Sequence, residues 1–399
     1  MFTFMISLLF CASVLAISIG QTEVIYPSLE TLASGMKRMK FRAFDQDMEL
    51  NLEPAGDVIS DNFTIIYSEG KTQATDVKSL KKRLFRDPEK GSALYISEKG
   101  LTEIEGVINS KLRIEPYETR EVTKNEFKAH QIITTFPEDK HFSDAMINFN
   151  MEKSYSERND TNVNGDECVE IEYLFLAENN FAAKFLDSEK LQVYLATVFV
   201  QVQTLMDTLN LNIKLRLIGT VIYKDNPPFF QGSLIPGQDV LNAGNIMKNM
   251  SNFLCKNEEN ELMKQADLVM LITINQIGYS SPSGMLFPSV IGVSYLGGAC
   301  DPCKKCALIK DDGRAFSTAY LIAHESAHLI GSPHDGAGPI FSLPGSPTAV
   351  ECPPFSGFIM GNTFGVTASM FSKCSRENIK YFLSKNEASC ITSCNSTTL

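Results

Sequence analysis

The chain has 399 residues, which is room for two domains, each with its own hydrophobic core. Hydrophobic residues make up 44% and charged residues 21%, the proportions of an ordinary globular protein. The formal net charge of −11 argues against a nucleic acid as partner.

Residues 1–20 have the features of a secretory signal peptide, although the usual positive charges at the start are missing. The apolar run is short, and the small residues Ser18 and Gly20 suit cleavage before Gln21. No later stretch reaches the roughly 18 uninterrupted apolar residues that a transmembrane helix needs. We therefore expect a secreted, extracellular protein with no membrane span. Four Asn-x-Ser/Thr sequons suit a glycoprotein, and they begin at Asn62, Asn159, Asn249 and Asn395.

Nine of the ten cysteines remain when a signal peptide carrying Cys11 is removed. In a secreted chain we expect them to pair as disulfides. Because their number is odd, one of them is free, joined to another molecule or used otherwise. The spacing Cys300-x-x-Cys303-x-x-Cys306 also allows a second zinc site, but disulfides are the stronger expectation. The nine are Cys168, Cys255, Cys300, Cys303, Cys306, Cys352, Cys374, Cys390 and Cys394.

The region 21–165 contains no cysteine and has β-rich stretches at 62–67 and 104–116. It ends in a polar, Asn-rich segment, 154–166, that is typical of a linker. The sequence therefore predicts a β-rich N-terminal region that is separate from the rest of the chain.

Strands and helices alternate beyond this linker. Apolar runs predict strands at 170–177, 213–223 and 267–273, with helices at 188–209 and 240–253. In the first of these helices, apolar residues recur every three or four positions, which predicts an amphipathic helix with one core-facing stripe. The alternation implies an α/β sheet with mainly parallel strands. The stretch 290–297 is expected at the edge of this sheet.

Residues 324–335 have the sequence H-E-x-x-H-x-x-G-x-x-H-D. His324 and His328 lie one turn apart on one helix face and can bind the same zinc ion. Gly331 can adopt backbone angles closed to other residues, so the chain can turn there and bring His334 to the metal. Glu325 stands beside the ligands, where it can take a proton from a water.

Three histidines leave a fourth zinc position open, which indicates a catalytic rather than a structural site. The alternative is a helix with surface histidines, but the glycine and the third histidine at fixed offsets favour zinc. The two other histidines, His130 and His141, are expected on the surface.

Met360 follows the zinc motif in a turn flanked by Gly357 and Gly361. A methionine is usually core filler, but this position and these glycines favour the Met-turn of metzincin proteases. With Asp335 after the third histidine and the stretch 295–302, residues 168–394 resemble the reprolysins, the adamalysin branch of the metzincins, which includes ADAM and snake-venom metalloproteases. The overall organisation is also similar to that of tick salivary metalloproteases.

The resemblance implies a metzincin catalytic domain over 166–399, with a mixed, mainly parallel five-stranded sheet, helices and a small C-terminal subdomain that carries the Met-turn. It implies one catalytic Zn²⁺ held by His324, His328 and His334. Glu325 would be the general base, and Met360 would pack beneath the site. The edge strand 290–297 would pair with an extended polypeptide substrate, although a plain edge strand is the alternative.

The resemblance also implies that 21–165 is a propeptide, since the family is made as zymogens. A stable accessory domain is the alternative, because cleavage signals near 165 are poor. Many members block the zinc with a propeptide cysteine, and this region has none. The mechanism of latency is therefore open, and Cys168 is expected in a disulfide rather than as the blocking thiolate.

Three disulfides are implied by the resemblance: Cys300–Cys390, Cys352–Cys374 and Cys255–Cys306. Cys168, Cys303 and Cys394 stay unassigned. The family also has a calcium site, for which Glu172 and Asp267 supply matching carboxylates, while Ser393 stands where an asparagine is expected.

We therefore expect a secreted, monomeric zinc endopeptidase that cleaves matrix or clotting proteins. Two alternatives remain. One is a catalytically silent protease fold that binds host receptors or platelets, and the other is a permanently latent zymogen. The intact Glu325 and histidine ligands favour the enzyme.

Overall fold

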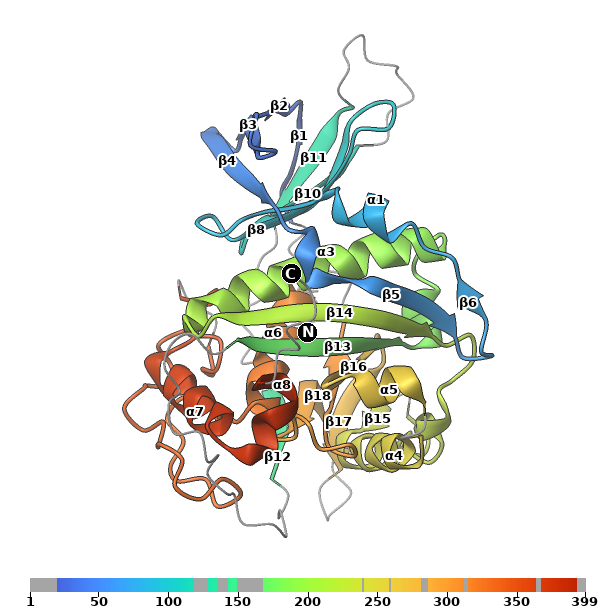
Figure 1. The fold of residues 1–399 in the computed structure, drawn as a ribbon, viewed down its shortest axis with the longest axis vertical. Coiled ribbons are helices and arrows are strands. Elements are labelled where there is room, and N and C mark those ends of the chain that lie inside the picture. The colour runs from blue at the N-terminus through green and yellow to red at the C-terminus, as the bar shows by residue number, and fades with distance from the viewer. Residues whose placement is uncertain are drawn as a thin grey trace, which may run out of the picture.

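The computed structural model describes residues 20–117, 128–134, 143–148, 168–238, 240–257, 260–280, 286–311, 315–363 and 367–392. Most of the expected signal peptide, the linker 154–166, His141, Asn159, Ser393, Cys394 and Asn395 lie outside these residues. Two β-sheets are stacked with helices between and beneath them (Figure 1). No helix within the described ranges is long and apolar enough to cross a membrane.

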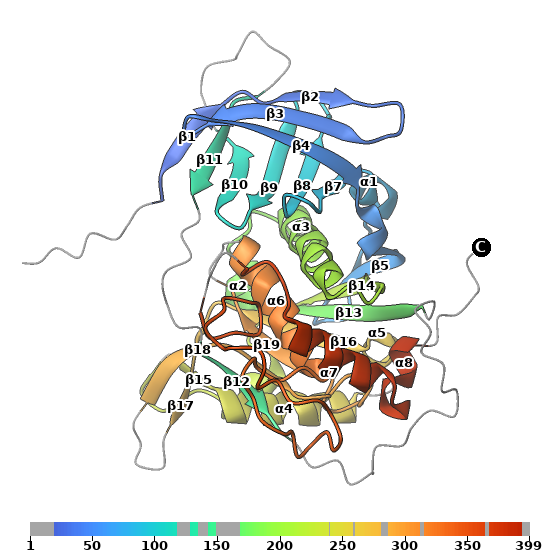
Figure 2. The same cartoon turned by 90° about the vertical axis from the view of Figure 1, so that its left-hand side faces the viewer.

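The N-terminal region forms an antiparallel sheet that curves over the rest of the molecule (Figure 2). One face of this sheet carries a separate apolar core that includes Leu52, Leu94 and Ile132, whereas Ala93 and Tyr95 on its other face belong to the main core of the molecule. The predicted β-rich stretch 104–116 forms two adjacent strands of this sheet. The strand order is β1 (Thr22–Ile25), β11 (His130–Thr134), β10 (Leu112–Pro116), β9 (Glu103–Asn109), β8 (Ser92–Ser97), β7 (Leu84–Asp87), β4 (Gln46–Pro54), β3 (Lys37–Ala43) and β2 (Ser28–Thr31).

His130 lies inside this sheet, so the expectation of a surface histidine is wrong. Its side chain is fully buried, and Nε2 accepts a hydrogen bond of 2.8 Å from the backbone N–H of Ile104. Because this acceptor must stay unprotonated, the local environment favours the neutral ring. Burial lowers the pKa of His130 to about 4.

The full chain is therefore expected to lose stability in acid through His130. Its folded-state pKa lies below the unfolded value, so the stabilisation is present above pH 6.5 and is lost as the pH falls toward 4. The loss is on the order of 3 kcal/mol when complete. Thermal unfolding at pH 7 and pH 4.5 should show a larger drop for the natural chain than for His130→Gln. Equal drops would contradict this role of His130.

The second sheet has at its centre the mixed, mainly parallel five-stranded arrangement that the resemblance implies. Strands β14, β13, β16 and β19 run parallel, and β18 is antiparallel to β19. All six residues of β16 are buried, as in a strand covered on both faces. The order is β15 (Val240–Asn242), β17 (Gln276–Ser280), β18 (Leu286–Tyr295), β19 (Cys306–Lys310), β16 (Leu268–Thr273), β13 (Val169–Ala177), β14 (Ile213–Ile222), β5 (Ile59–Tyr67) and β6 (Thr72–Gln73), and β12 (Ser143–Ile147) pairs with β18 off this path.

The N-terminal region contributes strands to this second sheet at two places. β5 pairs in parallel with β14, and β6 pairs with β5. β12 pairs in parallel with β18 on the other side of the sheet. The stretch 62–67, which the sequence places in the N-terminal β-rich region, therefore belongs to the sheet of the following region.

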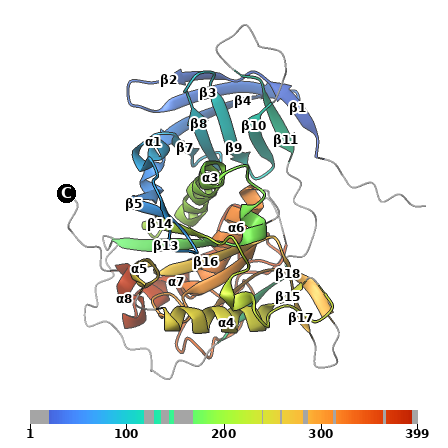
Figure 3. The ribbon, with the colours of Figure 1, turned by 90° about the vertical axis from the view of Figure 1, so that its right-hand side faces the viewer.

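Helices α3 (Ser188–Met206) and α6 (Ala315–Leu329) cover one face of the second sheet, and α4 (Ala243–Lys256) covers the other (Figures 2 and 3). The predicted helix over 240–253 begins later, because 240–242 forms β15 and the Asn242 side chain caps the helix. The shorter helices are α1 (Val77–Lys81), α2 (Asn179–Ala182), α5 (Glu261–Gln265), α7 (Lys373–Leu383) and α8 (Ser389–Thr392).

Helix α3 lies between the two sheets, so the predicted apolar stripe is buried in the core, but the opposite side of the helix is buried as well. Val198, Phe199 and Val200 are consecutive and all fully buried. The reason is that α3 packs against β14 and α6 on one side and against β7 and β8 of the N-terminal sheet on the other. The side under the N-terminal sheet therefore buries polar residues such as Gln192 and Thr197, which an amphipathic helix would expose to water.

Two of the disulfides have the pairing that the resemblance implies, Cys300–Cys390 and Cys352–Cys374. The third pairing is wrong, because Cys255 is bonded to Cys303. Cys306 begins the buried strand β19, where its thiol is fully covered, and it is the free cysteine of the described residues. Cys168 is disulfide-bonded. Since Cys300 and Cys303 belong to two different disulfides, the Cys300-x-x-Cys303-x-x-Cys306 spacing forms no second zinc site.

The two described sequon residues differ in how their amides are used. Asn62 is exposed on β5. The Nδ2 of Asn249 donates to the carbonyl of Gln231 at 2.9 Å and to Oγ of Ser233 at 3.0 Å. A glycan on this nitrogen would break these bonds, which argues against Asn249 as an attachment site.

Candidate active site

Helix α6 presents two of the three histidines. Tyr320, Ala323 and Ala327 are buried and anchor the helix in the core. The helix stops before Gly331, which has φ of +96°. The N–H of Gly331 bonds to the carbonyl of His328 at 2.9 Å, and that of Ser332 to Ala327 at 2.8 Å, a Schellman arrangement. This turn redirects the chain and brings His334 back beside the helix.

The three imidazoles converge through their Nε2 atoms. The Nε2 of His334 lies 3.2 Å from that of His328 and 3.3 Å from that of His324. Nδ1 of His324 donates to the carbonyl of Ile359 at 2.7 Å, and Nδ1 of His328 to that of Ser332, also at 2.7 Å. These bonds fix the tautomer in which Nε2 carries the lone pair, the arrangement that orients a histidine ligand.

The spacing of the Nε2 atoms fits zinc. A tetrahedral zinc ion with Zn–N bonds of about 2.0–2.1 Å holds its ligand atoms about 3.3–3.4 Å apart. The measured separations of 3.2 and 3.3 Å match this value. His324, His328 and His334 are thus suited to hold one zinc ion together.

Glu325 lies beside this cluster and is fully buried. Its Oε2 accepts a bond of 2.5 Å from Oγ of Ser294, whereas its Oε1 has no partner among the described residues. A Cβ at Gly292 would lie 2.2 Å from Oε1, so any larger residue there would displace the carboxylate from this position. Burial raises the pKa of Glu325 to about 8, a value near the operating range of a general acid or base.

The turn at Met360 supports the histidines through its backbone. The carbonyl of Ile359 accepts from Nδ1 of His324 and, at 2.8 Å, from the hydroxyl of Tyr320. The carbonyl of Met360 accepts from the N–H of Asp335 at 2.9 Å, and the Met360 side chain is fully buried. The turn therefore fixes both the helix and the loop that carries His334.

One residue of this cluster has no signal in the sequence. Oδ2 of Asp144, on β12, lies 3.0 Å from Nε2 of His324, 3.2 Å from that of His328 and 2.7 Å from that of His334. A lone aspartate in a polar stretch matches no motif, and only the pairing of β12 with β18 brings it here.

Asp144 and the histidines also shift one another's pKa values. Burial opposes its ionisation, but His324 and the close contacts of Oδ2 with the three rings hold the pKa of Asp144 well below its usual range. Burial alone would lower the pKa of His324, but Asp144 outweighs it and raises that pKa to about 9. For His328, burial prevails and lowers the pKa to about 4.

Strand β18 runs beside the cluster, and both of its edges are paired. β19 pairs with one edge. β17 and β12 pair with successive parts of the other edge. Residues 290–295, expected to be free to pair with substrate, are paired with 143–147 (Figure 2).

The two carboxylates expected at a calcium site lie together on β13 and just before β16. Oδ2 of Asp267 accepts from the N–H of Glu172 at 2.8 Å. Burial raises the pKa of Asp267 to about 7 and also raises that of Glu172. The sulfurs of Cys300 and Cys390 lie close to Asp267, but they are joined in a disulfide and supply no thiolate.

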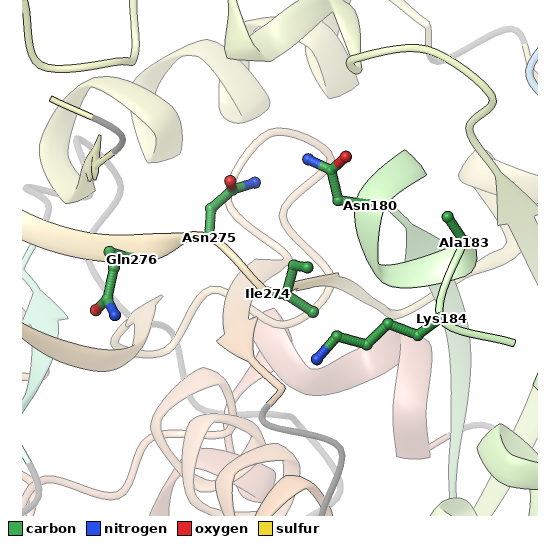
Figure 4. A pocket seen from close by; sticks show the side chains of 6 residues that line it. All are labelled: Asn180, Ala183, Lys184, Ile274, Asn275 and Gln276. Atoms are coloured by element: carbon green, nitrogen blue, oxygen red, sulfur yellow. The ribbon is translucent and has the colours of Figure 1, made fainter. Parts of the chain in front are cut away.

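A separate polar hollow lies between α2 and the loop after β16 (Figure 4). Asn180 and Asn275 carry their amides beside its opening, and Lys184 extends past Ile274. It shares no lining residue with the histidine cluster, and its polar, open character does not suit a substrate pocket.

The comparisons agree with this geometry. The model of the "Reprolysin (M12B) family zinc metalloprotease" matches residues 173–394, more than half of the chain. "Venom metalloproteinase antarease TserMP_A" of Tityus serrulatus is 38% identical over 98% of this chain and 98% of its own. "Venom metalloproteinase BumaMPs1" of Olivierus martensii is 34% identical over 97% of this chain and 96% of its own.

These relatives are venom proteins, not the tick salivary proteases whose organisation the sequence resembles. The solved structure of metalloproteinase-II from Bacteroides fragilis aligns over 88% of this chain and 90% of its own. At 11% identity and a TM-score of 0.41, that likeness is too distant to carry an argument. The family match, the full-length relatives and the three converging histidines together show that the chain belongs to the reprolysin family of zinc metalloproteases.

Proposed function

We propose that the protein is a secreted endopeptidase that hydrolyses peptide bonds of extracellular matrix or haemostatic proteins, with Glu325 as its general base. The observation that carries the proposal is the unpartnered Oε1 of Glu325 beside three converging Nε2 atoms. Venom proteins among the relatives and several disulfides support secretion.

Each residue then has a defined task. His324, His328 and His334 would hold the zinc, which would polarise the scissile carbonyl and lower the pKa of a water to about 7. Ser294 holds one oxygen of Glu325, so the other stays free to take the proton of the attacking water. Glu325 later passes this proton to the leaving amine. The substrate main chain pairs with 290–295 of β18 once that edge is clear.

We propose a signal peptide at 1–20, a propeptide at 21–165 and the catalytic domain at 166–399. The face of α3 under the N-terminal sheet supports this division, because it carries buried polar side chains. Thr197 lies against Gly106 of β9, and Gln192 lines a cavity with Tyr95 of β8. Nε2 of Gln192 has no partner within the described residues. After removal of the N-terminal region, these polar side chains could form hydrogen bonds with water.

The test is cleavage of gelatin and fibrinogen by the purified secreted protein, with and without 1,10-phenanthroline, followed by N-terminal sequencing. The proposal expects chelator-sensitive cleavage by a form that starts near residue 165. A trimmed, zinc-loaded form that cuts nothing would instead favour a silent binding protein acting on host receptors or platelets. If only an inert form starting at Gln21 is found, the chain is a latent zymogen.

We also propose that Glu172 and Asp267 bind a calcium ion. In about hundredfold excess over its Kd, calcium should stabilise the fold by about 2.7 kcal/mol, measured as a rise in thermal midpoint. Asp267→Asn should abolish the rise, whereas the exposed Asp225→Asn should keep it. A rise that survives Asp267→Asn would place the ion elsewhere.

A further inference from the structure

We propose that Asp144 is the fourth zinc ligand in the full-length chain, so that the region before residue 165 blocks the active site with a carboxylate instead of a cysteine. This inference rests on the zinc site formed by the three histidines. It adds a residue that the family's motifs do not contain, and it supplies the latency mechanism that a cysteine-free N-terminal region leaves open.

A single oxygen of Asp144 occupies the position of a fourth ligand. Oδ2 of Asp144 faces all three Nε2 atoms, at 3.0, 3.2 and 2.7 Å. Carboxylate oxygens bind zinc at about 2.0–2.2 Å, so an oxygen ligand lies about as far from the nitrogen ligands as they lie from one another. The oxygen therefore stands on the side of the cluster that the histidines leave open. An ordinary surface ion pair would engage one imidazole rather than three.

The segment that carries Asp144 is held firmly by its neighbours. The main chain of β12 pairs with β18, with Asp144 opposite Gly292. The carbonyl of Ile147 accepts from the N–H of Leu296 at 3.1 Å, and Oδ1 of Asn148 accepts from Oγ of Ser342 at 3.1 Å. The Asp144 side chain is only 11% exposed. A carboxylate fixed by neighbours on both sides loses little entropy on binding a metal.

The same short segment occupies both the metal position and the substrate edge of the active site. Residues 143–147 cover the edge of β18 that would bind a substrate main chain, and Asp144 takes the position that an attacking water needs. Met146 and Ile147 pack against the main core. Removal of this segment would therefore open the metal and the substrate edge in one step.

The test uses the full-length chain from Gln21 with Glu325→Gln, which prevents self-trimming, and with cobalt in place of zinc. The visible spectrum of bound cobalt reports its ligands independently of activity. Asp144→Asn should change the spectrum and weaken metal binding by about tenfold or more. Asp144→Cys should add a thiolate-to-cobalt charge-transfer band and protect the new thiol from alkylation until the metal is removed. The control Asp47→Asn changes an exposed aspartate of β4 and should leave the parent spectrum unchanged.

In the chain with Glu325 restored, Asp144→Asn should cleave a fluorogenic peptide measurably, but more slowly than the trimmed chain because β12 still pairs with β18, while mass spectrometry still shows the untrimmed mass. The natural chain should be inert under the same conditions. If cobalt binds but both Asp144 variants keep the parent spectrum, and the thiol introduced by Asp144→Cys is fully alkylated, Asp144 is not a ligand and the histidine site stands. If no variant binds cobalt, the zinc site and the proposal fail together. Should Asp144→Asn not fold, the charge-transfer band of Asp144→Cys decides.

Discussion

Glu325→Gln in the trimmed protein is expected to lower kcat by at least about 10²–10⁴-fold while zinc stays bound, because the amide cannot accept the proton of the attacking water. The effect should fall on kcat rather than KM, since Glu325 acts on the reacting atoms and not on substrate binding. The measurement is cleavage of a fluorogenic peptide together with zinc content by elemental analysis.

The matched control is Glu351→Gln, which makes the same chemical change at an exposed glutamate paired with Lys373. It should leave both kcat and zinc content at the natural values. A Glu325→Gln enzyme with more than a tenth of the natural kcat would remove Glu325 from the role of base. Loss of zinc in this variant would point to a structural role instead.

Gly331→Ala is expected to destabilise the catalytic region by about 2–5 kcal/mol and to weaken zinc binding. Two effects add. The residue has φ of +96°, where a Cβ is strained, and the new Cβ would lie 2.7 Å from Cβ of Phe382 on α7. Because the turn at Gly331 positions His334, the strain should displace this ligand and weaken zinc binding. Thermal unfolding and competition with a zinc chelator measure the two consequences.

Gly338→Ala is the control for this substitution, since a Cβ there meets nothing within 4 Å. It should change neither the thermal midpoint nor zinc affinity. Gly331→Ala with natural zinc affinity would show that the loop carrying His334 is held in place without the helix-ending turn.

Local patterns predict the elements of the site well. The spacing of His324 and His328 needs only one regular helix, and the glycine that ends it is explicit in the sequence. Strand β16 is a continuous apolar run, and β13 and β14 alternate charged and apolar residues before an apolar second half, so their burial follows from the sequence pattern. These features depend only on residues that are close in the sequence, and sequence patterns show such local relations directly.

The features that sequence could not predict depend on contacts far apart in the chain. The all-round burial of α3 needs the N-terminal sheet above it, and β5 joins β14 across more than a hundred residues. Cys303 rather than Cys306 reaches Cys255, because a turn presents Cys303 while strand β19 buries Cys306. Asp144 meets His324 at a separation of 180 residues, without any local signal.

The most direct test compares zinc content and peptide cleavage in the full-length chain from Gln21 and in the trimmed chain. We expect one zinc per chain in both forms, with phenanthroline-sensitive cleavage by the trimmed form alone. A full-length chain that cleaves as fast as the trimmed one would contradict the block by Asp144. A trimmed chain that holds zinc yet cleaves nothing would contradict the enzyme itself.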